Sequence, residues 1–161
     1  MSPAVPVRPE MVIEALSRGL PSDRIVVDAD VLAALSHDDA EWAPAGQAAA
    51  AVRARSEAEV QHVVRACAEL GIPVVPRGAG TGLSGGANAV TGCVVLDVAA
   101  MNQVLEIDPD NLLAVVQPGA VNNDVKAAVA EHGLWYPPDP AARPGRRSAA
   151  TCPPTPVACA A

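Results

Sequence analysis

The segment Pro76-Arg77-Gly78-Ala79-Gly80-Thr81-Gly82-Leu83-Ser84-Gly85-Gly86 is the most informative part of this chain. Five glycines fall within nine positions, directly after the apolar run 72–75. Such a segment has too few side chains to build a core, so its value lies in its backbone. Glycine permits positive φ and lets main-chain N–H groups approach a ligand without an intervening Cβ. Because successive N–H groups in a turn form an anion-binding concavity, we expect a phosphate-binding loop.

Apolar runs on both sides of this loop predict a strand–loop–strand unit, with strands at 73–75 and 93–98. Upstream, residues 50–55 predict another strand and residues 57–70 an amphipathic helix that ends before Gly71. Ser56 offers an N-cap oxygen, and Glu59 completes a capping box. The predicted inner face of the helix consists of Val60, Val63, Val64, Cys67 and Leu70.

The remaining elements follow from periodicity and turn residues. Two short helices are expected at 10–19 and 28–35, and two antiparallel strands at 104–107 and 112–117 around the turn Asp108-Pro109-Asp110-Asn111. A last helix is expected before Gly133, with Asn122 or Asn123 as its N-cap. Its inner face would hold Val125, Ala128 and Val129. The first half is β-α-β and the second half begins a hairpin sheet, so the fold class is mixed α+β.

Bulk properties limit the function. The net charge of −7 over 161 residues argues against nucleic acid or an anionic membrane as partner. No apolar run is long enough to span a bilayer, and the N-terminus lacks signal-peptide features, so we expect a cytoplasmic protein. The four cysteines have no ligand spacing; neither a metal site nor a disulfide framework is expected, and Cys67 and Cys93 are interpreted as buried structural thiols.

The spacing Gly80-x-Gly82-x-x-Gly85 formally matches a dinucleotide fingerprint. A Rossmann site, however, needs a helix directly after the glycines and an acidic residue about twenty positions on, and the sequence predicts neither. A P-loop is excluded because no Lys-Ser or Lys-Thr pair follows. A strand–loop–strand cradle for a diphosphate remains, and a connecting loop without any ligand stays open as its alternative.

Residues 75–86 resemble the FAD-diphosphate loop of the vanillyl-alcohol oxidase/PCMH flavoprotein family. Segments 52–60, 116–119 and 134–140 also resemble parts of that family, and the similarity covers about residues 10–140. Within the family, the branch of glycolate oxidase and D-lactate dehydrogenase is most similar. The resemblance implies a truncated PCMH-type FAD-binding domain, with a β-α-β first subdomain and the start of an antiparallel second one. The expected organisation is a helical lead-in at 1–43, the partial domain at 44–141 and a disordered tail at 142–161.

The resemblance also implies roles for individual residues. Residues 77–82 would wrap the diphosphate with backbone N–H groups, and Thr81 and Ser84 would add hydroxyl donors. Gly85 and Gly86 would allow close approach of the cofactor, and Gly119, Pro138 and Asp139 would line the flavin or its ribityl chain. Arg77 has a second interpretation, as a salt-bridge anchor beneath the loop. The full predicted cofactor-binding set is Pro76, Arg77, Gly78, Ala79, Gly80, Thr81, Gly82, Ser84, Gly85, Gly86, Gly119, Pro138 and Asp139.

No histidine occupies a position that resembles a covalent flavin attachment, so FAD is expected to be non-covalent. His37, His62 and His132 are the histidines concerned. The implied reaction is oxidation of a 2-hydroxy acid, glycolate or D-lactate, by hydride transfer to flavin N5. The implied partners are this small-molecule substrate and electron-acceptor subunits. No catalytic residue is assigned, because the substrate-binding groups are expected in a cap domain.

The tail departs from the family pattern. Members of this branch follow Pro-Pro-Asp-Pro-Ala with a second glycine motif resembling S-x-G-G-N-x-x-T-N-A-G-G and then the cap, whereas residues 142–161 contain neither. When residues 146–159 are written as codons and read from each third base, the permitted bases spell S-V-G-G-N-V-P-T-N-A-G-G-L. The tail is therefore interpreted as an out-of-frame product, and the fragment alone is expected to be inactive. The alternatives are a non-catalytic nucleotide- or phosphate-binding module and a non-functional truncated product.

Overall fold

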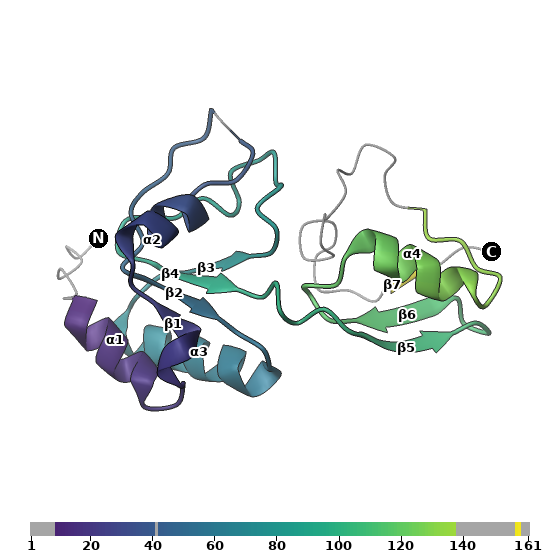
Figure 1. Cartoon of the computed structure of the whole chain (residues 1–161), viewed down its shortest axis with the longest axis horizontal. Coiled ribbons are helices and arrows are strands. Elements are labelled where there is room, and N and C mark those ends of the chain that lie inside the picture. The colour runs from purple at the N-terminus through teal and green to yellow at the C-terminus, as the bar shows by residue number, and fades with distance from the viewer. Residues whose placement is uncertain (1–8, 41, 138–156, 159–161) are drawn as a thin grey trace. The chain divides into compact units, whose positions relative to one another are not determined.

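The computed structural model describes residues 9–40, 42–137 and 157–158. The chain forms two compact units, the first made of 1–76 and 82–97 and the second of 77–81 and 98–161. Each unit has its own sheet (Figure 1). The elements in chain order are α1 (Pro9–Ser17), a 3-10 turn η1 (Ser22–Arg24), β1 (Ile25–Val26), α2 (Ala29–Leu35), β2 (Ala50–Arg53), α3 (Glu57–Leu70), β3 (Val74–Arg77), β4 (Val94–Asp97), β5 (Val104–Asp108), β6 (Leu113–Val116), α4 (Asn122–Ala130) and β7 (Val157–Ala158).

The sheet of the first unit has four strands in the order β1-β2-β4-β3. β2 runs parallel to β4, with Ala51 opposite Val95, and β1 pairs antiparallel with β2. The β3–β4 pairing is also parallel. Hydrogen bonds run from Val94 N to Pro73 O (2.9 Å) and from Val98 N to Arg77 O (3.0 Å), so the residue numbers of the paired residues rise together along both strands. β4 therefore lies between the two strands that α3 connects.

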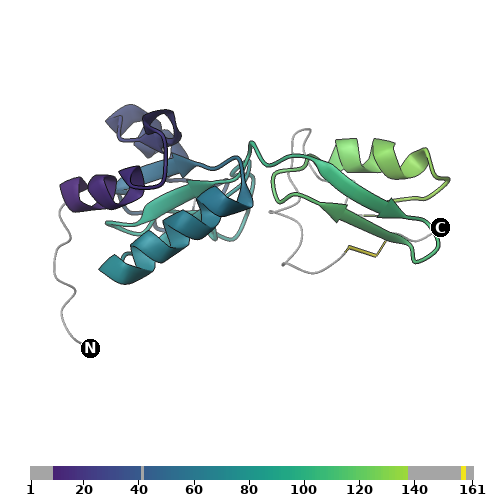
Figure 2. The same ribbon diagram turned by 90° about the horizontal axis from the view of Figure 1, so that it is seen from below.

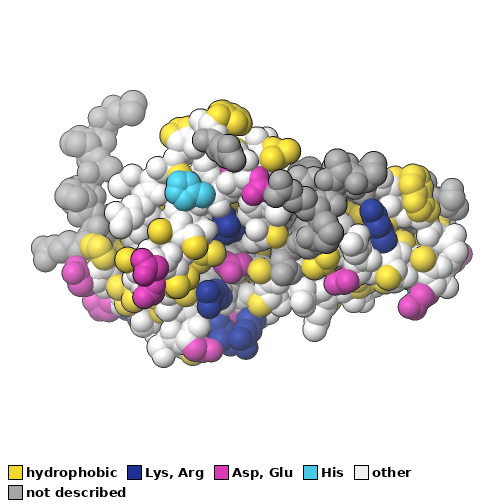
Figure 3. All heavy atoms as spheres, turned by 45° about the horizontal axis from the view of Figure 1, so that its top comes forward, with side chains coloured by type: hydrophobic (Ala, Val, Ile, Leu, Met, Phe, Trp, Pro, Cys, Tyr) yellow, Lys and Arg dark blue, Asp and Glu magenta, His cyan; other side chains and the backbone are white. Residues whose placement is uncertain are grey.

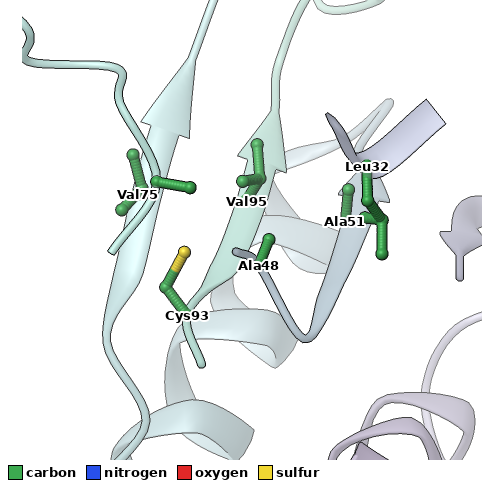
Figure 4. Close-up of a cluster of buried hydrophobic side chains, with 7 residues drawn as sticks. Leu32, Ala48, Ala51, Val75, Cys93 and Val95 are labelled. Carbon is green, nitrogen blue, oxygen red and sulfur yellow. The ribbon is translucent and has the colours of Figure 1, made fainter. Parts of the chain in front are cut away.

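Helices cover both faces of this sheet. α1 and α3 lie on one face and α2 on the other (Figures 1 and 2). Ala50, Ala51 and Val52 of β2 are all fully buried, which is typical of a parallel strand covered on both sides. The cluster on the α2 face is shown in Figure 4 and consists of Leu32, Ala48, Ala51, Val75, Ala89, Cys93 and Val95.

Ser56 and Glu59 both cap the start of α3, as predicted, but one of the two capping hydrogen bonds has a different donor from the one that a capping box uses. Ser56 Oγ accepts from the N–H of Glu59 at 3.3 Å, as predicted. Glu59 Oε2 accepts from the N–H of Arg55 at 2.7 Å, one residue before the N-cap, where the capping box places the reciprocal bond on Ser56 itself. The carboxylate of Glu59 also lies 3.4 Å from Nε of Arg24, so it ties the helix start to the segment before β1. The helix ends as predicted at Gly71, which has φ +66°.

The inner face of α3 differs from the prediction at two positions. Val63 and Cys67 are buried, but Val64 is 47% exposed and Ala66 is buried. One residue turns the helix by about 100°, so Val64 lies at the outer edge of the stripe centred on Val63 whereas Ala66 lies inside it. The prediction for Val64 was wrong because an apolar side chain does not have to be inside.

The second unit is built on the predicted hairpin. β5 and β6 pair antiparallel, β7 adds to β6, and α4 packs against β5. Asp108 organises the turn: its Oδ1 accepts from the N–H groups of Asp110 and Asn111 at 3.1 Å each, and Oδ2 accepts from Nδ2 of Asn111 at 2.6 Å. The core of this unit consists of Ala114, Ala120, Val125, Val129, Leu134 and Tyr136.

The predicted cap of α4 was wrong. The N-cap residue is Val121, which makes no side-chain cap bond, and Asn122 is the first helical residue. The side chain of Asn122 is buried, with only 2% of the residue exposed, so it faces the interior of the unit and does not close the helix end. Gly133 follows the helix with φ +73°, as the sequence predicts.

Cys67 and Cys93 are buried free thiols, as predicted. Burial, and then the neighbouring Cys93, raises the pKa of Cys67 to about 11. No group of three or more metal-binding side chains occurs in the described part of the chain. Among the same residues, no helix has the length and hydropathy needed to cross a membrane. Acidic and basic side chains are interspersed on the face of the first unit seen in Figure 3.

Candidate functional site

The glycine-rich segment joins two neighbouring parallel strands without a helix. β3 ends at Arg77 and β4 begins at Val94, and the connection between them contains only bends and turns. Parallel strands need a crossover of about a dozen residues or more, and here that crossover is the glycine loop. The predicted strand–loop–strand setting is therefore confirmed, and the helix required by a Rossmann site does not follow the glycines.

Residues 77–81 belong to the second unit. Gly80 is buried and has φ +73°, a conformation that favours glycine. A Cβ on Gly80 would lie only 2.5 Å from Cζ of Arg77, so the guanidinium occupies the space beside this glycine. The Arg77 side chain therefore lies against the loop, and its interpretation as a salt-bridge anchor stays a prediction. Thr81, which follows, is half-buried.

Residues 82–86 belong to the first unit. The three glycines among them differ in whether the local conformation or a close neighbour requires glycine. Gly85 has φ +74°, and a Cβ there would lie 2.6 Å from the Cβ of Ala43. A Cβ on Gly82 would lie 3.0 Å from Oδ2 of Asp38. Gly86 is exposed, its φ is not positive, and a Cβ there would meet no atom of the described residues within 4 Å. The fold itself therefore does not require glycine at position 86.

This arrangement fits a phosphate-bearing ligand. Gly86 leaves open space at the surface, and the neighbouring Ser84 is exposed and carries a hydroxyl donor. Main-chain N–H groups in such a loop are the donors that phosphate oxygens accept from in turn-shaped anion sites. Residues 85 and 86 have no side chain, so a diphosphate can approach their backbone without a Cβ of either residue in the way.

The other predicted site residues have separate outcomes. Pro76 is exposed at the end of β3, and Gly78 and Ala79 are half-buried. Gly119 is buried; its N–H donates to Met101 O at 2.7 Å, and a Cβ would lie 2.7 Å from that oxygen. Packing against backbone is thus sufficient to explain this glycine. Pro138 and Asp139 lie outside the described residues.

Two residues that the sequence did not single out contact the loop. Asn88 is 7% exposed, and its Oδ1 accepts from the N–H of Asp38 at 2.7 Å. Asp38 Oδ2 accepts in turn from the N–H of Ala87 at 3.4 Å. The only local signal for these residues is a polar Asn between two alanines and an Asp in a polar loop, which is too common to be informative.

A glycine-rich loop between parallel strands, followed by a separate hairpin unit, defines an α+β domain with a candidate site for a phosphate-bearing ligand. Comparison with known proteins makes the class specific, because residues 48–145 match the family described as FAD binding domain. The chain belongs to this FAD binding domain family. The family resemblance, the α+β fold class and FAD as the cofactor are thereby confirmed.

Individual relatives agree with this assignment. The chain is 46% identical over 91 residues to the glycolate oxidase subunit GlcD of Bacillus subtilis, a match that covers 56% of this chain and 19% of that protein. It is 37% identical over 134 residues to the D-lactate dehydrogenase of Anaerostipes hadrus, covering 83% and 28%. Among solved structures, p-cresol methylhydroxylase with bound substrate is 28% identical, with a TM-score of 0.65 over 77% of this chain and 25% of that one.

The chain spans less than a third of the length of these relatives. It carries an FAD-binding domain related to those of glycolate oxidase and of D-lactate and D-2-hydroxyglutarate dehydrogenases.

Proposed function

We propose that residues 76–86 hold the diphosphate of non-covalently bound FAD in an oxidoreductase that oxidises a 2-hydroxy acid of the glycolate or D-lactate type. The observation that carries this proposal is Gly86, a loop glycine that has no positive φ and whose added Cβ would meet no atom of the described residues. The substrate class is supported by the similarity to a glycolate oxidase subunit and a D-lactate dehydrogenase.

In this proposal the chain's own residues bind and orient. Main-chain N–H groups of residues 77–82 and the hydroxyl of Ser84 donate to the diphosphate, and Gly85 and Gly86 keep the approach open. Arg77 supports the loop from beneath through its contact with Gly80. When bound, FAD supplies the two-electron redox chemistry that amino-acid side chains lack. No described residue is assigned to substrate binding or to proton removal.

We further propose that residues from about 142 onward are translated out of frame. The codon pattern of residues 146–159 leaves only one base of each shifted triplet free, apart from the Ser and Arg codons, yet it permits a second glycine motif of S-x-G-G-N type. On this proposal, the 161-residue chain supplies one wall of the FAD site, binds FAD weakly and has no turnover.

The nucleotide sequence of the gene and two polypeptides test this function. One polypeptide is the present chain, and the other is produced after one base is restored before codon 142 so that translation continues in the alternative frame. The frame-restored protein should purify with stoichiometric flavin and reduce an acceptor dye with glycolate or D-lactate. Codons that cannot spell the motif would refute the frame proposal, and a frame-restored flavoprotein inactive on all 2-hydroxy acids would refute the substrate class.

A further inference from the structure

The loop that precedes the family-matched region contacts the glycine loop through two side chains. Asp38 and Asn88 lie 50 residues apart in the sequence and are joined by the hydrogen bond from Asp38 N to Asn88 Oδ1 (2.7 Å). Both residues lie in the first unit, and Asp38 lies ten residues before the start of the matched segment at 48. We refer to these two side chains and their hydrogen bonds as the 38–88 clasp.

Asn88 uses its whole amide in this clasp. Besides accepting from Asp38, it donates from Nδ2 to Ala43 O at 3.1 Å and to Pro44 O at 3.3 Å. The residue is 7% exposed, so its polar atoms are satisfied by the protein at a site with little access to water. A buried polar group that is fully bonded specifies one local conformation, because every alternative leaves donors or acceptors unpaired.

Asp38 completes the clasp on the glycine loop. Its Oδ1 accepts from the N–H of Ala40 at 2.9 Å, which fixes the carboxylate against its own loop. Its Oδ2 accepts from Ala87 N at 3.4 Å and lies 3.0 Å from the position of a Cβ on Gly82. The carboxylate therefore spans the loop from Gly82 to Ala87, on both sides of Gly86.

A third contact brings the two loops together at Gly85. A Cβ on Gly85 would lie 2.6 Å from the Cβ of Ala43, and Ala43 is the residue whose carbonyl Asn88 binds. The clasp thus sets how closely residues 40–44 approach residues 82–88.

We propose that Asp38 and Asn88 are positioning residues of the cofactor loop. They fix the backbone of residues 82–88 in the conformation that leaves Gly86 open. The segment before residue 48, which contains Asp38, therefore contributes to the geometry of the FAD site. The statement that the ligand is FAD rests on the proposed function. The ordering of the loop by Asp38 and Asn88 can be measured without any ligand.

The test compares the full 161-residue chain with three variants. N88A removes all three side-chain bonds of Asn88. D38N keeps an acceptor at Oδ1 for the N–H of Ala40. S36A is the matched control, since it removes only the buried Ser36 hydroxyl, which donates to Leu32 O at 2.7 Å at the end of α2, and keeps the backbone bond from Ala89 N to Ser36 O (3.0 Å). Hydrogen exchange of the peptide that contains residues 82–89 is measured below the lowest Tm, followed by titration with FAD to about 1 mM.

N88A should raise amide exchange of residues 82–89 about tenfold or more and weaken FAD binding about tenfold. The reason is that the variant lacks the three buried hydrogen bonds of the Asn88 side chain. D38N should raise exchange and weaken FAD binding about threefold, less than N88A, because the amide nitrogen in place of Oδ2 cannot accept from the N–H of Ala87. S36A should lower Tm while it leaves both measurements unchanged. If N88A does not unfold cooperatively, N88D replaces it, since it keeps the acceptor for Asp38 and loses both donated bonds.

The outcomes separate the two claims. Unchanged exchange of residues 82–89 in N88A would overturn the clasp. Raised exchange with unchanged FAD affinity would make the clasp purely structural and would leave the proposed function intact. An equal loss of FAD affinity in S36A would also overturn the positioning role, because overall stability would then explain the effect. Raised exchange in N88A without FAD binding by any of the four proteins would support the clasp and count against the proposed function.

Discussion

Gly85 and Gly86 are neighbours with opposite reasons for being glycine. Gly85 has φ +74° and lies against Ala43, whereas Gly86 has ordinary φ and an open surface. The glycine count in the sequence predicted a ligand loop but could not distinguish these two causes, because both depend on the local conformation and on neighbours distant in the sequence. The same holds for Gly119, whose packing against Met101 O becomes visible only in the folded chain.

Substitution by alanine separates the two glycines. G85A should destabilise the chain by about 2 kcal/mol or more, since a left-handed conformation and a close contact both oppose the new methyl group. G86A should change the free energy of unfolding by less than about 0.5 kcal/mol and still weaken FAD binding. Thermal unfolding and FAD titration measure the two effects. A G86A variant with unaltered FAD affinity would contradict the role of this glycine.

The buried thiols provide a second prediction at this scale. The pKa of Cys67 is raised from 9.0 to about 11 by burial, so the folded state opposes ionisation of this thiol. Stability from this group is complete below about pH 9 and is lost as the pH rises toward 11. Cys67 and Cys93 should therefore resist alkylation at about pH 8 until the protein unfolds, as peptide mass spectrometry can show. Rapid labelling of either residue in the native protein would contradict their burial.

Most elements were predictable because their signals are local. The helix 57–70, its cap at Ser56 and its end at Gly71 follow from periodicity and capping chemistry. The hairpin follows from Asp108-Pro109-Asp110-Asn111 between two apolar runs. β1 was not predicted, because two residues have no periodicity and this strand exists only by pairing with β2. The insertion of β4 between β2 and β3 is likewise a long-range pairing that no local pattern reports.

The hairpin turn responds to the charge of Asp108. Hydrogen bonds from Asn111, first from its side chain, hold the pKa of this carboxyl below its ordinary value of 3.8. The stabilisation is therefore present above about pH 4 and is lost as the pH falls through the lower folded-state pKa. D108A should remove this acid dependence and raise amide exchange at Asp110 and Asn111. A variant with wild-type exchange and wild-type acid unfolding would show that the turn does not need the carboxylate.

At the scale of the whole molecule, the glycine loop is shared between two compact units. Residues 77–81 belong to one unit and residues 82–86 to the other. Sequence patterns located the loop and the family resemblance named its ligand, but the 38–88 clasp joins positions 50 residues apart and has no motif. Such contacts depend on the tertiary arrangement of two irregular loops, which periodicity does not describe.

The proposed frame change makes a prediction for the chain as a whole. Purified 161-residue protein should carry no stoichiometric flavin and should show no turnover with glycolate or D-lactate. An absorption spectrum with one bound FAD per chain would contradict the proposal that this chain supplies only one wall of the site.

The central claim is that the backbone of residues 76–86 binds the diphosphate of FAD. Residue-resolved amide chemical shifts during titration of the isotope-labelled chain test it most directly, since they detect binding as weak as about 1 mM. We predict that FAD shifts the amide signals of residues 77–86, that ADP reproduces part of the effect and that G86A weakens it. Shifts confined to other parts of the chain, or none at these amides, would contradict the account.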